Sequence, residues 1–152
     1  MMFRELMAEF AGRIGLEGPV EIDEDGFCTF GFGDATVAMQ GMDEIETLAL
    51  SADVGAPPPE RLEQLYGELL RANYNFAGTN GATLSLDPQT GAVHLCRCMP
   101  YSELGGNRLE TFVLDFITAL ADWRRRVRDF RADDGFAAAD GAIAGGDGLF
   151  RV

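Results

Sequence analysis

Three side chains that could bind a metal or act in catalysis occupy alternate positions of one segment. His94, Cys96 and Cys98 are two residues apart, so a strand would place all three on one face. A zinc site ordinarily needs four such ligands, and Cys28 is the one cysteine left elsewhere. A catalytic triad would have to use His94, the only histidine, and no nucleophile-elbow motif accompanies it. We therefore expect a structural histidine, no catalytic residue, no metal site and no cofactor. A small enzyme or metal protein using this trio is the alternative.

Three glycine-containing segments match ligand-binding loops only in part. Residues 23–26 begin like a calcium loop, but the glycine comes too early and Asp34 stands where a bidentate Glu is needed. Residues 78–81 lack the Gly-Lys-Ser/Thr ending of a phosphate loop. Residues 145–148 resemble one calcium nonapeptide without the stacked repeats that such sites require. All three are interpreted as turns or loops.

The charge balance excludes several classes of partner. The chain has 152 residues, with 12 basic and 25 acidic side chains, for a formal net charge of −13. Such a surface repels nucleic-acid phosphates and anionic membranes. The sequence contains no apolar run of 18 residues, so we expect no transmembrane helix. The number of cysteines, three, is odd and fits a reducing cytoplasm better than a disulfide framework.

The elements that would position these residues follow from hydrophobic periodicity. Residues 20–54 alternate as a three-stranded meander, and residues 82–99 alternate as a hairpin around a turn at residues 87–91. Helical spacing predicts a first helix from Phe3 to about Gly15, a central helix from about Pro59 to Asn73, and a long third helix from Leu109 to Val127. The sequence thus predicts an α+β fold, with an antiparallel sheet of about five strands and three helices in the order α-β-β-β-α-β-β-α.

The C-terminal part of the chain changes composition. Residues 124–128 contain four arginines, which suit a solvated helix end and, as an alternative, an acidic partner. Ala, Gly and Asp then supply 15 of the last 21 residues. We therefore divide the chain into a domain at residues 1–131 and a tail at residues 132–152 that composition predicts to be flexible. We expect the tail's scattered apolar residues to dock in a groove of this molecule or a neighbour.

Several of these features resemble a known family. The central helix ends in the pattern L-x-x-x-L-L-x-x-N (Leu65, Leu69, Leu70, Asn73), followed by the strand at residues 82–87, a Thr-Gly turn and Val-His-Leu. Together with the long last helix carrying Trp123, they resemble the class I type III secretion chaperones, the Tir-chaperone family. The resemblance runs from about Phe3 to Phe130.

The resemblance implies a cytoplasmic bacterial homodimer that binds the N-terminal segment of a secreted effector and keeps it extended, soluble and ready for secretion. It leaves open a contact with the secretion ATPase. Exposed apolar grooves and free sheet edges would suffice for this role. The candidate client-binding residues are Phe3, Phe10, Phe30, Phe32 and Met39.

The implied homodimer needs an interface, which we place on the central helix and the second strand of the hairpin. Its candidate residues are Leu65, Tyr66, Leu69, Val93 and Leu95. A binding or regulatory module with the same fold, acting on a folded protein partner, is the other alternative. The nature of the ligand distinguishes the two, since a chaperone of this kind binds an unfolded segment.

Overall fold

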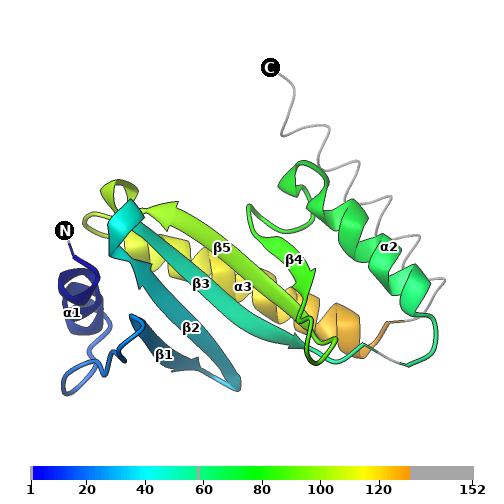
Figure 1. The fold of residues 1–152 in the computed structure, drawn as a ribbon, viewed down its shortest axis with the longest axis horizontal. Helices are drawn as coiled ribbons and strands as arrows, with labels where there is room; N and C mark the ends of the chain where they lie inside the picture. The colour runs from blue at the N-terminus through cyan, green and yellow to red at the C-terminus, as the bar shows by residue number, and fades with distance from the viewer. Residues whose placement is uncertain (1, 58, 131–152) are drawn as a thin grey trace.

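Three helices and a five-stranded antiparallel sheet make up the computed structural model of the chain (Figure 1). The structure describes residues 2–57 and 59–130. The predicted fold class and element order are confirmed, whereas the tail at residues 132–152 lies outside the described residues. The elements are α1 (Phe3–Arg13), β1 (Phe27–Phe32), β2 (Ala35–Met42), η1 (Asp43–Ile45), β3 (Thr47–Gly55), α2 (Leu62–Asn73), η2 (Tyr74–Phe76), β4 (Thr83–Leu86), β5 (Val93–Pro100), η3 (Tyr101–Glu103) and α3 (Arg108–Arg128).

The sheet has the strand order β1-β2-β3-β5-β4, so β1 and β4 are its two edges. Helix α3 runs along the sheet behind β3 and β5, and α2 lies beyond the β4 edge (Figure 1). Alternation along the strands sends the larger apolar side chains to the face that α1 and α3 cover. These residues form one core with the apolar faces of the helices, centred on Met39, Leu48, Leu50, Leu95, Phe116 and Trp123.

Two element boundaries differ from the predictions. The meander begins at Phe27, because the chain at residues 20–22 runs beside β1 without pairing in the sheet. Helix α2 begins at Leu62 and not near Pro59, since Arg61 has a φ of 68° and its left-handed conformation cannot continue into a right-handed helix. Among the described residues, no helix is long and apolar enough to cross a membrane.

Helix α1 is fixed at its N-terminus by a residue forty positions away. Asp43 Oδ1 accepts hydrogen bonds from the Phe3 backbone N–H (3.0 Å) and from the Tyr101 hydroxyl (2.9 Å). The first N–H groups of a helix have no partner within the helix, so Asp43 acts as a cap supplied by η1. Burial and the bond to Asp43 raise the pKa of Tyr101. This one carboxylate therefore joins α1, η1 and η3.

Replacing Asp43 should loosen α1. Asp43→Ala leaves two donors without an acceptor and is expected to lower the free energy of unfolding by about 2 kcal/mol in urea denaturation. Asp43→Asn keeps an oxygen acceptor and is the matched control, with a smaller expected loss. Equal stability of Asp43→Ala and the unaltered chain would contradict this role.

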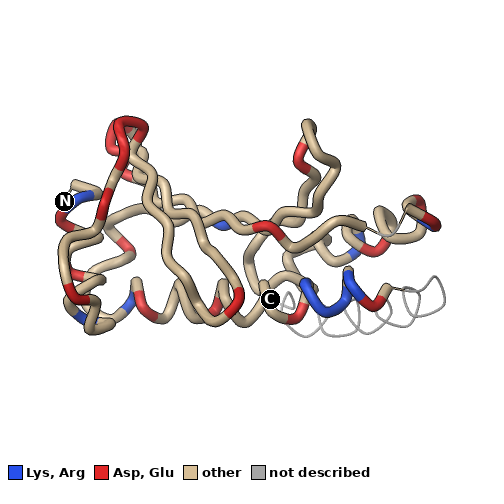
Figure 2. The backbone as a smooth tube through the Cα atoms, turned by 90° about the horizontal axis from the view of Figure 1, so that it is seen from below, with Lys and Arg blue, Asp and Glu red and all other residues tan. Residues whose placement is uncertain are grey.

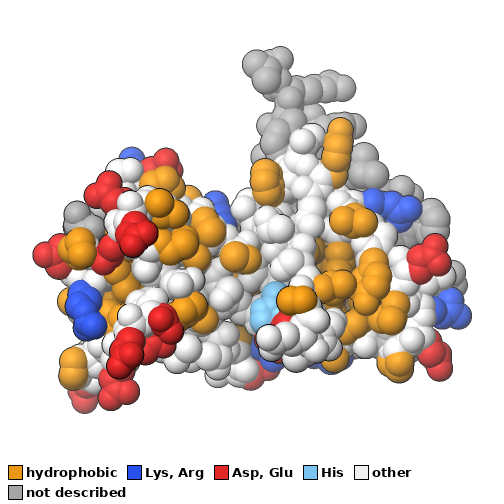
Figure 3. All heavy atoms as spheres, viewed as in Figure 1, with side chains coloured by type: hydrophobic (Ala, Val, Ile, Leu, Met, Phe, Trp, Pro, Cys, Tyr) orange, Lys and Arg blue, Asp and Glu red, His pale blue; other side chains and the backbone are white. Residues whose placement is uncertain are grey.

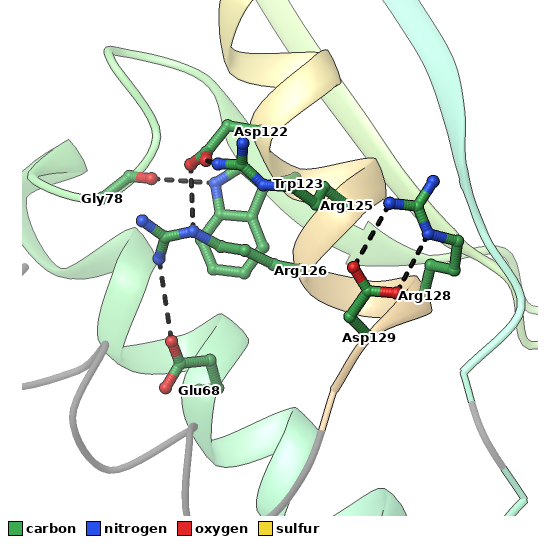
Figure 4. A network of polar contacts seen from close by, with 8 residues as sticks. All are labelled: Glu68, Gly78, Asp122, Trp123, Arg125, Arg126, Arg128 and Asp129. Carbon is green, nitrogen blue, oxygen red and sulfur yellow. Dashed lines mark hydrogen bonds and ion pairs between the residues drawn. The ribbon is translucent and has the colours of Figure 1, made fainter.

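Helix α3 is joined to α2 and to the loop that follows α2 by a small network (Figure 4). The Trp123 indole N–H donates to the Gly78 carbonyl at 2.8 Å, and the Arg126 guanidinium lies 5.0 Å from the centre of the Trp123 ring. Arg126 also pairs with Asp122 (2.9 Å) and lies 3.9 Å from Glu68 of α2. Glu68 is buried, and its Oε2 has no hydrogen-bond partner among the described residues.

The pKa of Glu68 is raised, because burial outweighs the lowering effect of Arg126 and Arg71. Because the folded protein binds this proton more tightly than the unfolded chain does, protonated Glu68 adds to the free energy of unfolding at a pH below the unfolded-state pKa. This stabilisation is lost as the pH rises through the folded-state pKa. Ionised Glu68 therefore costs stability at neutral pH. Glu68→Gln is expected to stabilise the protein at pH 7 by on the order of 1 kcal/mol, with a smaller gain near pH 4. Denaturation at both pH values measures this, with the exposed Glu63→Gln as control; a destabilised Glu68→Gln at pH 7 would refute it.

Candidate functional site: an open sheet edge beside an apolar groove

The β4 edge of the sheet is blocked at Leu84 by a side chain. The Asn73 side chain, at the end of α2, donates to the Leu84 carbonyl (3.0 Å) and accepts from the Leu84 N–H (2.9 Å). Both groups of Leu84 point away from β5, so Asn73 takes the hydrogen bonds that another strand would make. An added strand would have to displace Asn73 and the end of α2.

The β1 edge is open. The Phe27 carbonyl accepts a hydrogen bond from the Asp23 backbone N–H, and the Phe27 N–H donates to the Asp23 carboxylate. The backbone groups of Phe27 therefore face away from β2. Outward and inward positions alternate in an antiparallel strand, which makes Thr29 and Gly31 the next outward residues. Within the described part of the chain, no hydrogen bond reaches the outward N–H and C=O groups of these two residues. Such groups are available to a further strand.

An apolar groove runs beside this edge, and we call it the edge groove. It has a volume of about 720 Å³, and its walls are the segment that follows α1 and strand β1. Ile14, Leu16 and Phe27 are exposed there, and Val20 and Ile22 are half-buried. Thr29 and Gly31 also line it. Unpaired backbone groups and uncovered apolar side chains thus meet in one place.

The predicted client-binding residues divide between the groove and the core. Phe30 and Phe32 line the edge groove. Phe10 lies behind them and packs edge-on against Phe30, with ring centroids 5.3 Å apart. Phe3 and Met39 are fully buried in the core and line no part of the groove. The structure therefore places Phe30 and Phe32 in the wall of the groove and Phe3, Phe10 and Met39 in the buried core, with Phe10 packed behind Phe30.

The predicted interface residues also lie mainly inside the molecule. Tyr66 is half-buried, and the other four, Leu65, Leu69, Val93 and Leu95, are buried within the chain itself. The same region exposes a different apolar set, which we call the α2 patch: Leu70, Tyr74, Phe76 and Leu86. Leu70 and Tyr74 are 71% and 67% exposed. Figure 3 shows hydrophobic side chains gathered on this face over α2 and the β4 side of the sheet.

The histidine and cysteine trio lies on the sheet face opposite α3. His94 Nε2 is 4.0 Å from an Asp87 carboxylate oxygen, and Cys96 and Cys98 are free thiols. Burial raises the pKa of Cys96, and burial together with the Asp23 charge raises that of Cys28 to about 11, so both thiols stay protonated at neutral pH. Cys28 belongs to the helix-covered core and cannot join the other two. Among the described residues, no three His, Cys, Asp or Glu side chains gather as a metal site would require.

Sequence reasoning missed the segment that forms one wall of the edge groove. Val20 and Ile22 alternate, a strand-like signal that predicts them as part of the meander at residues 20–54, whereas Leu16 lies before that range. Their place beside β1 depends on the turn at residues 23–26, where Asp23 bonds back to Phe27. An alternating segment does not show whether it pairs in a sheet or lies beside one.

The comparisons with known proteins identify the family of the chain. A family model, the Tir chaperone protein (CesT) family, matches residues 5–124. The chain belongs to this family. The resemblance noted in the sequence is therefore confirmed. A search of curated proteins gives no match.

Solved structures of similar fold include members of the same group of chaperones. The chain is 26% identical to a chain of the ExsC–ExsE complex, with a TM-score of 0.69 over 82% of this chain and 92% of that one. The chain is 20% identical to a chain of the HopA1–SchA chaperone–effector complex, with a TM-score of 0.64 over 84% of this chain and 93% of that one. It is 22% identical to a chain in the structure of the Yersinia pestis type III secretion chaperone SycH in complex with a stable fragment of YscM2. The TM-score is 0.63 over 82% of this chain and 98% of that one. The last two likenesses show the shared fold.

Proposed function

We propose that the protein is a bacterial cytoplasmic type III secretion chaperone that binds the N-terminal segment of an effector at the edge groove and keeps it extended. Family membership supports the chaperone role, and similar folds are found in a chaperone–effector complex. The observation that carries the binding site is the pair of unpaired residues Thr29 and Gly31 on a strand edge that lines an apolar groove.

This geometry suits an extended polypeptide better than a folded surface. Backbone hydrogen bonds along a strand edge accept any sequence, while the groove selects apolar side chains at alternate positions. The net charge of −13 keeps a protein with exposed apolar surface soluble and favours clients that carry basic residues. Binding of this kind needs no catalytic or metal-binding residue.

Purification from the source bacterium, followed by mass spectrometry and limited proteolysis of the complex, tests the function. The expected result is a secreted protein held through roughly its first hundred residues, as for a disordered client that wraps a large surface. Amide exchange should also slow at Thr29 and Gly31 in the complex. A folded cytoplasmic partner bound elsewhere would replace the chaperone role with that of a regulatory module.

The α2 patch is the surface we propose for homodimerisation, in place of the buried residues selected from sequence. Its aromatic side chains project from a turn in which Asn75 and Phe76 have φ values of 52° and 58°, conformations that cost energy in residues with side chains. That turn holds Phe76 at the surface, 51% exposed. A second copy meeting this patch would cover it, and the buried Leu65 and Leu69 would support it from beneath.

A charge in the α2 patch should separate the dimer. Leu70→Glu places a carboxylate in the proposed interface and is expected to give a folded monomer by light scattering, with unchanged circular dichroism. Leu114→Glu is the matched control, because Leu114 is 63% exposed on α3 and does not belong to the patch. A dimeric Leu70→Glu variant would remove this surface from consideration.

A further inference from the structure

A second hollow lies at the C-terminal end of α3, and we call it the arginine groove. It has a volume of about 280 Å³. Its floor is apolar and includes Phe32, Val54, Ile117 and Leu120. Arg124, Arg125 and Arg128 also line it, as does Asp34. Figure 2 shows this arginine run as a blue segment near the end of α3.

The present partners of these arginines are weak competitors for another anion. Arg124 pairs with Asp34 at 3.3 Å, and the Asp34 side chain is 92% exposed. Arg125 pairs with Asp122 one helical turn away, and Arg128 pairs with its neighbour Asp129. Exposed pairs of this kind contribute about 0–1 kcal/mol, so incoming carboxylates can replace them at little cost. The arginine groove therefore remains a cationic surface in a chain of net charge −13.

The chain itself supplies a segment of matching chemistry immediately afterwards. Residues 131–152 contain four aspartates and two arginines, and Asp133 and Asp134 are followed closely by Phe136. We propose that residues 133–136 dock in the arginine groove of the same chain. In this arrangement the two carboxylates pair with the arginines of the groove and the Phe136 ring covers the apolar floor.

Chain connectivity favours this occupant over a separate molecule. Arg128 lines the groove, and Phe136 follows it by eight residues, a maximum reach of about 28 Å at 3.3–3.6 Å per residue. A segment tethered at this length has an effective concentration in the millimolar range, so even a weak contact is populated. The proposal is independent of the client-binding role, because it concerns the chain without a client.

Photocrosslinking of the full chain tests the contact. The change Phe136→p-benzoylphenylalanine places a reactive group at the proposed point of contact. Mass spectrometry is expected to find crosslinks within one chain to the peptides that contain Phe32 or residues 117–124, with a yield that does not change on dilution. Crosslinks mainly to other sites, a yield that falls on dilution as expected for a second copy, or no crosslink would overturn the proposal.

Charge reversal supplies a second readout. In the crosslinking background, Asp133→Lys with Asp134→Lys should lower the yield about tenfold, because two attractive pairs become like-charge contacts. Asp140→Lys with Asp147→Lys makes the same change in net charge and should leave the yield unaltered. Adding Arg124→Glu and Arg128→Glu to the first variant should restore the yield. Equal losses in both aspartate variants would show a general charge effect and overturn the assignment.

Discussion

Thr29→Pro is expected to weaken binding of the client at least tenfold while the chaperone stays folded. The Thr29 N–H faces away from β2, so a proline there removes no hydrogen bond of the described chain, and edge strands tolerate proline for this reason. An added client strand would lose one backbone bond and would meet the proline ring. We expect affinity to fall at least tenfold, about 1.4 kcal/mol, by isothermal titration with the purified effector segment.

The matched control is Thr29→Val, which keeps the N–H and the branched shape of the side chain. Its client affinity should equal that of the unaltered protein. Thermal unfolding of both variants shows whether β1 is intact. A folded Thr29→Pro variant with full affinity would mean that the client does not add to the β1 edge, and the edge groove would then bind side chains alone.

Among glycine-to-alanine substitutions in the described fold, Gly41→Ala should lower the free energy of unfolding most. A Cβ at Gly41 would overlap both the Cβ and the ring of Phe3, which is buried against this part of β2. The ring cannot withdraw without releasing the N-terminus of α1, where the Phe3 N–H also bonds to Asp43. We expect a loss of about 3 kcal/mol in the free energy of unfolding, at the upper end for overpacked cores.

Two further variants separate this clash from a general effect of losing a glycine. Gly67→Ala, in the middle of α2, meets nothing within 4 Å and should stabilise the protein by about 0.5–1 kcal/mol. Phe3→Gly removes the ring and the Cβ that lies equally close, and in that background Gly41→Ala should cost far less, which a double-mutant cycle detects as coupling. Additive losses would show that the two positions do not meet.

The fold could be predicted from the sequence, but only part of the candidate site could, and the reason is physical. Periodicity identifies the strands and helices because each buries one face, and Phe30 and Phe32 were selected for the groove by that alternation. Periodicity cannot separate a residue buried within its own chain from one buried by a partner. Leu69 and Leu70 are adjacent in the same pattern, yet Leu69 is buried in the core and Leu70 is exposed in the α2 patch.

Hydrogen bonds between segments far apart in the chain could not be predicted from the sequence either. Asn73 was identified as the end of a helix, but its bonds to Leu84 depend on where the loop returns the chain. The cap that Asp43 provides for α1 crosses forty residues and has no local signature. Both contacts are single side chains that complete the hydrogen bonding of another element, a role that spacing along the chain does not encode.

The obstruction of the β4 edge by Asn73 also bears on how the protein behaves at high concentration. A sheet with two bare edges is a divalent building block, since each copy can add one neighbour on either side and so grow into an open-ended fibre. Because Asn73 blocks β4 at Leu84 and α2 lies beyond that edge, β1 is the edge of the described sheet that can accept a full strand: two sheets that join by β1 leave edges obstructed at Leu84, which limits further growth. An apolar, edge-exposing protein can thus remain abundant with little polymerisation through its own strands.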